Sequence, residues 1–307
     1  MKKFWKLLLA FVLMLSLSAC SKGEGKVEVK DGVDFELLDA VRVTNDSTNT
    51  VYYYFLASLT NNSKSNYSIS ELSYNVTDGE NHDVHAIDRQ QTTITQSLAP
   101  DRSTFVYGYV GYPNNNQKDM GIYFPKNKQF LSFKSIDLRN ISDKNVNYST
   151  SDQFTLYEDK TFEFDVDSSK MKYSFENGNS VVRGLKITYI NKTNKPLVVP
   201  YISPVATLKG IDLNQYKDRG NFAEMDLEQI KGVDFKTNDM QPKIETINGA
   251  ITGYECFYLT ENQELTCTIN FTFEHAIPNF ASYNPKAITI DLNSAPLGYS
   301  QEINVKY

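Results

Sequence analysis

The chain has 307 residues and a formal net charge of −6, with three cysteines, 20 tyrosines and 18 phenylalanines. This length is sufficient for two ordinary domains, each able to bury its own core. The acidic balance argues against nucleic acid as a partner, because phosphate backbones are bound by basic surfaces.

The first 20 residues have the order of a secretory signal. Lys2, Lys3 and Lys6 form a basic segment, residues 7–17 are almost wholly apolar, and small residues precede Cys20. This order is typical of a cleavable signal. The apolar run is shorter than the about 20 residues that span a bilayer, so we do not expect it to remain as a transmembrane helix.

The tetrad Leu17-Ser18-Ala19-Cys20 resembles the lipobox of bacterial lipoproteins. The resemblance implies that Cys20 receives a diacylglyceryl group, that residues 1–19 are removed, and that acyl chains such as palmitate anchor the protein. Two acyl chains give stable anchoring. The expected location is therefore the extracytoplasmic face of the cell membrane. Ordinary secretion with an incidental cysteine is the open alternative.

Residues 20–32 are predicted to form a lipidated tether, because residues 21–26 are polar, contain glycine and lack apolar periodicity. Removal of the signal takes away three lysines and no acids, which changes the net charge from −6 to −9. A negative charge disfavours adsorption onto anionic lipid. We therefore expect the folded part to contact the membrane only through its lipid anchor.

Residues 33–141 are predicted to form a first β-sandwich domain. Runs of β-branched and aromatic residues alternate with short polar turns, a pattern that favours antiparallel strands. The expected strands are 35–43, 51–59, 69–76, 91–98, 103–110 and 133–138. Residues 140–152 are polar and turn-rich, which is typical of a domain boundary.

Residues 153–307 are predicted to form a second β-sandwich domain with an insertion near residues 210–241. Phe222, Met225 and Ile230 recur within that charged insertion, which indicates a loop or one short helix. A loop added to a rigid β scaffold is where binding often resides, and a surface excursion without function is the alternative. The expected strands are 161–166, 181–190, 197–199, 253–259, 264–273, 287–292 and 302–305.

Two short matches indicate that one domain duplicates the other. A strand followed by Asn61-Asn62-Ser63 matches a strand followed by Asn191-Lys192-Thr193, and residues 135–140 match residues 289–293. The offset grows from 130 residues at Asn61/Asn191 to 154 at Ile136/Ile290, which predicts an insertion of 24 residues in the second domain.

The strand, the Asn61 turn and the later turn at residues 98–103, which contains Pro100, occur in an order that resembles the immunoglobulin-like domains of Gram-positive lipoproteins of unknown function. The second half matches through residues 189–195 but lacks the proline-containing turn. The resemblance implies an immunoglobulin-like fold and a surface location, and it carries over no functional residues.

Cys256 and Cys267 flank a segment that is expected to form two strands joined by a turn at Glu261-Asn262. If the two strands pair, the cysteines face each other with Cβ atoms about 4.5–5.5 Å apart, slightly wider than a disulfide prefers. A disulfide would persist outside the cytoplasm. The sequence leaves this bridge and two buried thiols equally open.

Catalytic and metal sites have little support in the sequence. His82, His85 and Asp88 could ligate a metal, but residues three apart on a strand face opposite sides, so a solvated loop is favoured. There is no Gly-x-Ser-x-Gly nucleophile elbow and no glycine-rich phosphate loop. The Asn-x-Ser/Thr sites at Asn61 and Asn191 are interpreted as turns. We expect no metal, no cofactor and no enzymatic activity.

A group of tyrosines allows two interpretations. Some could form a recognition surface for glycan or protein, but packing in the core and across strands is favoured. The group consists of Tyr52, Tyr53, Tyr54, Tyr107, Tyr109 and Tyr112.

Taken together, these patterns predict a non-enzymatic surface lipoprotein that binds an unknown envelope or extracellular partner. A cell-wall enzyme with a dispersed site and an envelope spacer or assembly factor are the alternatives.

Overall fold

The computed structural model describes residues 25–45, 49–79, 88–91, 97–114, 119–142, 146–147, 149, 151–176, 179–201, 203–211, 225–228, 231–237, 256–273, 287–293 and 302–305. These residues form 23 strands and two 3-10 turns, so the chain is mainly β with several antiparallel sheets. None of their helical segments is long and apolar enough to cross a membrane. The predicted signal and Cys20 lie outside the described residues.

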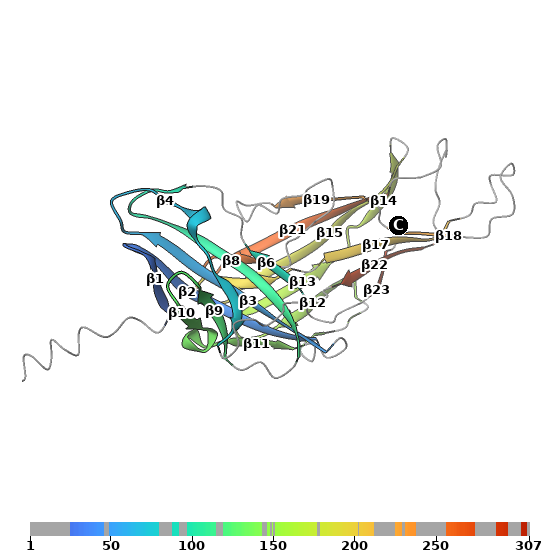
Figure 1. The fold of residues 1–307 in the computed structure, drawn as a ribbon. Coiled ribbons are helices and arrows are strands. Elements are labelled where there is room, and N and C mark those ends of the chain that lie inside the picture. Colours follow the sequence, from blue (N-terminus) through green and yellow to red (C-terminus); the bar gives the residue numbers. More distant parts are fainter. Residues whose placement is uncertain are drawn as a thin grey trace, which may run out of the picture.

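The strands before residue 143 form three sheets, drawn in blue to green in Figure 1. The largest has the order β1-β2-β3-β8-β6, with β11 parallel to β2; the others are β10-β9-β5 and β4-β7. The elements are β1 (Lys26–Lys30), β2 (Val33–Asn45), β3 (Thr50–Asn61), β4 (Tyr67–Ser68), η1 (Ile69–Glu71), β5 (Asn75–Asp78), β6 (Asp88–Gln91), β7 (Ser97–Leu98), β8 (Arg102–Pro113), β9 (Met120–Phe124), β10 (Gln129–Ser132), η2 (Phe133–Ile136) and β11 (Arg139–Ser142).

The later strands again form three sheets, with the orders β12-β13-β15-β21-β19, β18-β17-β22-β23 and β16-β20. In addition, β14 pairs with β15. The elements are β12 (Gln153–Glu158), β13 (Phe162–Asp167), β14 (Lys172–Glu176), β15 (Asn179–Asn191), β16 (Leu197–Pro200), β17 (Ser203–Ile211), β18 (Met225–Glu228), β19 (Lys231–Thr237), β20 (Cys256–Leu259), β21 (Glu264–Phe273), β22 (Ala287–Asn293) and β23 (Glu302–Val305).

The two groups of strands repeat one topology. The order β1-β2-β3-β8-β6 corresponds to β12-β13-β15-β21-β19, the order β10-β9-β5 to β23-β22-β17, and the pair β4-β7 to β16-β20. The long strand β2 pairs along all of β3, whereas β13 and β14 together take this place along β15. We call β1–β11 the first repeat and β12–β23 the second repeat.

Only one of the two sequence matches marks equivalent positions. Asn61 and Asn191 end the equivalent strands β3 and β15, but residues 135–140 lie in η2 and β11, whereas residues 289–293 lie in β22, the counterpart of β9. The pairing registers also make Ser103 equivalent to Glu264. The offset thus grows from 130 to 161 residues between these points, so the second repeat contains 31 added residues rather than 24.

Several expected elements differ in the structure. Part of the predicted tether is strand β1, in which buried Val27 alternates with exposed lysine and glutamate, the period of a strand. The segments expected to begin strands at residues 69 and 133 begin with the turns η1 and η2. A helix was the wrong expectation for the described part of the insertion, because β18 and β19 are strands; Phe222 and Ile230 lie outside the described residues.

The apolar cores do not follow the boundary between the repeats. One cluster lies within the first repeat and includes Phe35, Phe55 and Phe133. The other combines the core of the second repeat with residues from β2, β3, β8 and β11 of the first. Strand β3 is therefore buried on both faces over most of its length. These shared residues of the first repeat are Val41, Val43, Tyr52, Tyr54, Leu56, Tyr109 and Ile141.

Candidate functional site: the junction between the repeats

The junction is built on the outer face of the sheet in the first repeat. Alternate residues of a strand point to opposite sides, so Tyr53 and Phe55 of β3 enter the core of the first repeat, whereas Tyr52 and Tyr54 enter the shared core. This explains why β3 has an almost continuous apolar sequence. A strand that is covered on both faces lacks the polar positions of a half-exposed strand.

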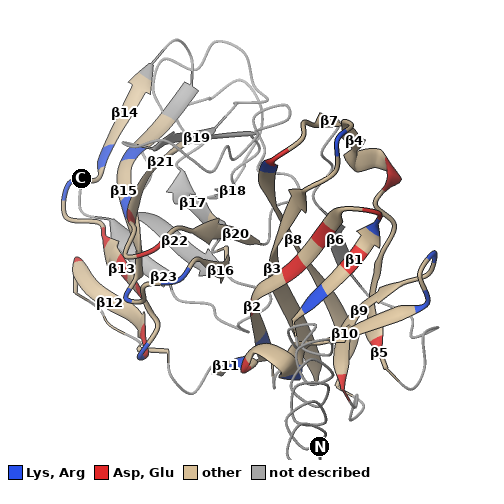
Figure 2. Ribbon diagram, turned by 90° about the vertical axis from the view of Figure 1, so that its left-hand side faces the viewer, with Lys and Arg blue, Asp and Glu red and all other residues tan. Residues whose placement is uncertain are grey.

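The second repeat covers this face with its two-stranded sheet, since β16 packs against β2 and β3, and β20 packs against β8. The ring of Tyr258 on β20 lies 4.8 Å from that of Phe105 and 5.5 Å from that of Tyr107, centroid to centroid. Tilted and edge-to-face aromatic contacts of this kind stabilise beyond the area that they bury. Figure 2 shows β16 and β20 lying toward the β2-β3-β8 sheet.

A buried ion pair lies beside these aromatic contacts. Asp39 directly follows the β-bulge of β2, and its carboxylate accepts hydrogen bonds from the guanidinium of Arg139 on β11, with Nε 2.9 Å from Oδ1 and Nη2 close to Oδ2. The side chain of Asp39 is 8% exposed and that of Arg139 is 13% exposed. The backbone N–H of Val198 in the second repeat also donates to Asp39 Oδ2, at 2.8 Å.

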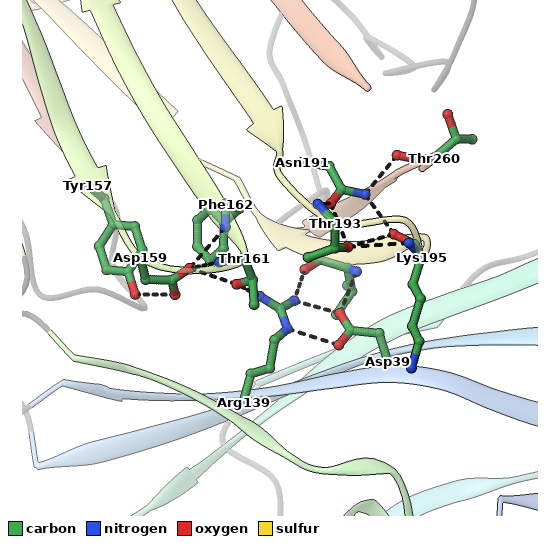
Figure 3. Close-up of polar contacts among 11 residues, drawn as sticks. Asp39, Arg139, Tyr157, Asp159, Thr161, Phe162, Asn191, Thr193, Lys195 and Thr260 are labelled. Carbon is green, nitrogen blue, oxygen red and sulfur yellow. Dashed lines mark hydrogen bonds and ion pairs between the residues drawn. The ribbon is translucent and has the colours of Figure 1, made fainter. Parts of the chain in front are cut away.

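Arg139 also reaches directly into the second repeat (Figure 3). Its Nη2 donates to the carbonyl of Val198 at 2.9 Å, and its Nη1 donates to Thr161 Oγ1 at 3.1 Å. The guanidinium carbon lies 5.4 Å from the centre of the Phe162 ring. Asp39 and Arg139 thus belong to the first repeat but bind backbone and side chains of the second.

Asp159 holds the Thr161 side of this network in place. Its Oδ1 accepts hydrogen bonds from Thr161 N, Thr161 Oγ1 and Phe162 N, at 2.6, 2.7 and 2.9 Å, and its Oδ2 accepts one from Tyr157 Oη at 2.8 Å. Burial by itself would raise the pKa of Asp159, but these hydrogen bonds outweigh it, so the pKa lies below its ordinary value. The carboxylate therefore stays charged and fixes the turn between β12 and β13.

The chemistry of this junction is structural. Removing two charges from water costs several kcal/mol per ion unless pairing and further hydrogen bonds offset it. Here both oxygens of Asp39 and all three nitrogens of Arg139 have partners. The network fixes the position of β16 in the second repeat relative to β2 and β11 in the first.

The Asn-x-Ser/Thr sites form a second recurring arrangement, as turns. Asn61 Nδ2 donates to the carbonyls of Ser65 and Leu98, both at 2.8 Å, while its Oδ1 accepts from Ser63 N and Oγ. Asn191 Nδ2 donates to the carbonyls of Lys195 and Thr260, both at 2.7 Å. Both amide groups are buried and hydrogen-bonded, so neither is accessible as a glycan acceptor.

Asn191 Oδ1 accepts from Thr193 N and Oγ1, both at 2.8 Å, in the same way as Asn61 accepts from Ser63. The turn interpretation is therefore confirmed at both sites. The shared network also shows that these two positions are equivalent in the repeated strand order.

The expected cysteine hairpin is wrong. Strand β20, which carries Cys256, pairs with β16, whereas β21, which carries Cys267, pairs with β15 and β19. The chain crosses from one sheet to the other between residues 259 and 264, so the cysteines are not cross-strand neighbours. The structure contains them as two buried thiols rather than as a disulfide. Burial raises the pKa of Cys267 to about 12.

The favoured interpretation of the tyrosines is confirmed. Tyr52, Tyr53, Tyr54, Tyr109 and Tyr112 are buried, and half-buried Tyr107 packs against Tyr258. None of these six rings forms an open recognition surface.

The candidate metal residues give no site in the described chain. His82, His85 and His275 lie outside the described residues, and Asp88 begins β6. Within the described ranges, no group of three histidine, cysteine, aspartate or glutamate side chains could hold a metal ion.

Asp39, Arg139 and Tyr258 form the junction, and the motifs in the sequence did not identify any of the three. A signal was present for the first of them. Asp39 is an acid in the apolar run from Leu37 to Val41, and an acid inside a buried strand requires a partner. Nothing near Arg139 or Tyr258 in the sequence identifies them as that partner or its neighbour.

No protein-family model matches this chain, and no curated protein matches its sequence.

Proposed function

We propose that the protein is a surface lipoprotein, anchored through Cys20, whose two immunoglobulin-like repeats form a non-enzymatic binding or adhesion module of the cell envelope. The observation that carries this proposal is the shared buried face between the repeats, fixed by Asp39 and Arg139. A rigid pair presents the loops of both repeats in one arrangement. Preorganisation of this kind lowers the entropic cost of binding.

The immunoglobulin-like assignment is supported by the strand order. In the first repeat, the sheets β1-β2-β3-β8-β6 and β10-β9-β5 enclose a core, and strands distant in the sequence lie side by side, as β3 and β8 do. Crossed connections of this kind are typical of Greek-key sandwiches. Binding residues on such scaffolds are concentrated in the loops at their ends.

The length of the tether supports a position close to the membrane. Strand β1 begins at Lys26, so only residues 21–25 separate it from Cys20. A fully extended chain spans at most about 3.3–3.6 Å per residue. The first repeat would therefore lie within roughly 20 Å of the lipid-bearing residue, and a partner would approach from the side of the second repeat.

The anchor is tested by metabolic labelling with a palmitate analogue and by cell fractionation. The natural chain is expected to take up the label and to remain in the membrane fraction. The Cys20→Ala variant is expected to lose the label and to remain uncleaved, with the mass of residues 1–19 retained. Normal processing and retention of the Cys20→Ala variant in the membrane would contradict the proposal.

The binding role is tested with residues 20–307 carrying Cys20→Ser, so that no lipid interferes. Saturable binding to intact cells or purified envelope is expected. Turnover of peptidoglycan or peptide substrates by the same protein would favour the cell-wall enzyme instead.

A rigid spacer is the second candidate function, and the same buried junction supports it. A spacer predicts no saturable binding. It also predicts that an unrelated rigid domain of equal length could replace the second repeat without loss of function, whereas a flexible chain could not.

A further inference from the structure

We infer that the two repeats dock in one direction only, and that this makes the chain a closed, rigid pair. The second repeat presents an apolar strand edge, and the first repeat presents the apolar sheet face that receives it. Because the repeats share one topology, each position on these two surfaces has a counterpart in the other repeat. The counterparts show whether the contact could also form in the reverse direction.

The docking edge is apolar only in the second repeat. In β16 and β20, Val198 pairs with Tyr258. In the equivalent strands β4 and β7, Ser68 pairs with Ser97. Val198 is buried, and Tyr258 contacts the aromatic face of β8, whereas Ser97 is exposed. The first repeat therefore has serine at both positions and lacks the aromatic ring with which the second repeat contacts β8.

The receiving face is apolar only in the first repeat. The pairing registers of β3 with β8 and of β15 with β21 make Phe105 equivalent to Thr266 and Tyr107 equivalent to Thr268. By the same registers, Leu56 of the first repeat is equivalent to Lys186. Positions that are aromatic or aliphatic in the first repeat are thus threonine or lysine in the second. This polar face of the second repeat does not match an apolar edge.

The ion pair is one-sided as well. Asp39 pairs with Leu56, and Asp167 pairs with Lys186, so the two aspartates occupy equivalent positions. Asp39 is buried against Arg139. Asp167 instead accepts hydrogen bonds from the N–H and the hydroxyl of Ser169 within its own turn, the N–H at 2.9 Å. An acid is present in both repeats, but only the first uses it to bind a neighbouring repeat.

These differences have a consequence for assembly. A head-to-tail contact between like units continues into a fibre when both surfaces are present on every unit. Repeat proteins end such arrays with units whose outer face is polar. Here the first repeat has the apolar receiving face but no apolar docking edge. The second repeat has the apolar docking edge but no apolar receiving face. The partner that fits each docking surface is the other repeat of the same chain.

Distances between spin labels test the rigid pair in residues 20–307 carrying Cys20→Ser. Labels are placed at the exposed positions Lys64 and Lys170, one in each repeat, through Lys64→Cys and Lys170→Cys. The native cysteines are buried thiols and are expected to stay unlabelled. A single narrow distance distribution is expected for this parent protein. A broad distribution in the parent would overturn the inference.

Tyr258→Ser tests the docking edge, because it places the side chain of the first repeat in the second. The distribution is expected to broaden and shift to longer distances. The control is Tyr123→Ser on β9, another half-buried tyrosine of the sheet β10-β9-β5, which should leave the distribution narrow. An unchanged distribution in Tyr258→Ser, with the unfolding midpoint of the parent, would overturn the assignment of the edge.

A double variant, Ser68→Val with Ser97→Tyr, tests the one-way property without disturbing the junction. It gives the first repeat an apolar edge, but the threonine face of the second repeat offers no surface for it. Light scattering is expected to show a monomer at all concentrations. Dimers or longer assemblies that grow with concentration would overturn one-way docking.

Discussion

Asp39 and Arg139 are 100 residues apart in the sequence, and their side chains form a two-point ion pair in which Arg139 Nε lies 2.9 Å from Asp39 Oδ1. The same carboxylate accepts the N–H of Val198, and the same guanidinium donates to the carbonyl of Val198. One residue of the second repeat is thus bound through both of its backbone polar groups. The ion pair is therefore a direct part of the junction.

Arg139→Ala should destabilise the protein strongly, because it leaves the carboxylate of Asp39 buried without its counter-charge. Loss of one partner of a buried pair costs roughly 3–5 kcal/mol. Urea unfolding followed by circular dichroism measures the loss. The control is Lys134→Ala, which removes an exposed contact 3.8 Å from Asp119 and should cost less than about 1 kcal/mol. If both variants lost the same free energy of unfolding, the buried ion pair would stabilise the protein no more than an exposed contact does.

Asn191→Ala should destabilise the turn after β15. The variant removes the amide that serves the carbonyls of Lys195 and Thr260 and that accepts from Thr193. Each buried group left without a partner costs roughly 1–3 kcal/mol. Asn194→Ala, at an exposed position of the same turn, is the matched control and should be nearly neutral. The prediction fails if both variants unfold at the same urea concentration.

Cys256 and Cys267 should resist alkylation at pH 8 in the folded protein and react completely after unfolding in urea. Thiolates rather than thiols are the reactive species, and the raised pKa of Cys267 keeps it protonated. Mass spectrometry with iodoacetamide, without a reducing agent, counts the modified residues. Two additions in urea and none in the native state are expected for the Cys20→Ser protein. No addition in urea would demonstrate a disulfide.

Stability should fall at alkaline pH. Burial raises the pKa of Cys267 from its ordinary 9.0 to about 12. Burial is also the main cause that raises the pKa of Tyr112 from 10.0 to about 12. In the window between the ordinary and the raised values, the unfolded chain loses protons that the folded protein retains, so folding becomes less favourable as pH increases. Urea midpoints between pH 8 and 11 test this, and Cys267→Ala should reduce the decline. A midpoint that is constant over this range would contradict the expected titration.

Gly184→Ala should destabilise the second repeat. Gly184 lies in the β-bulge of β15 with φ +97°, a conformation that side chains with a Cβ rarely adopt. A Cβ there would also lie 2.9 Å from the carbonyl oxygen of Lys170. Strain of this kind costs roughly 1–3 kcal/mol. Thermal unfolding should show the lower midpoint, and a variant as stable as the parent would show that the bulge relaxes without cost.

The sequence by itself determined the β class, most of the long strands and the two asparagine turns, because these depend on local patterns. Alternation identifies which side chains of a strand are buried, and Asn-x-Ser/Thr at a strand end satisfies its own backbone. The same patterns gave a false match between residues 136 and 290, since short β segments resemble one another wherever they lie.

Only the tertiary structure decided which surfaces meet. The predicted strands 253–259 and 264–273 are confirmed over their described residues, 256–259 and 264–273, but these belong to different sheets, so Cys256 and Cys267 do not face each other. The burial of the second face of β3 depends on the second repeat, and Asp39 pairs with Arg139, which lies 100 residues later in the chain. The sequence of a strand indicates that a side chain is buried. Which element buries it depends on the free energy of packing the two repeats together.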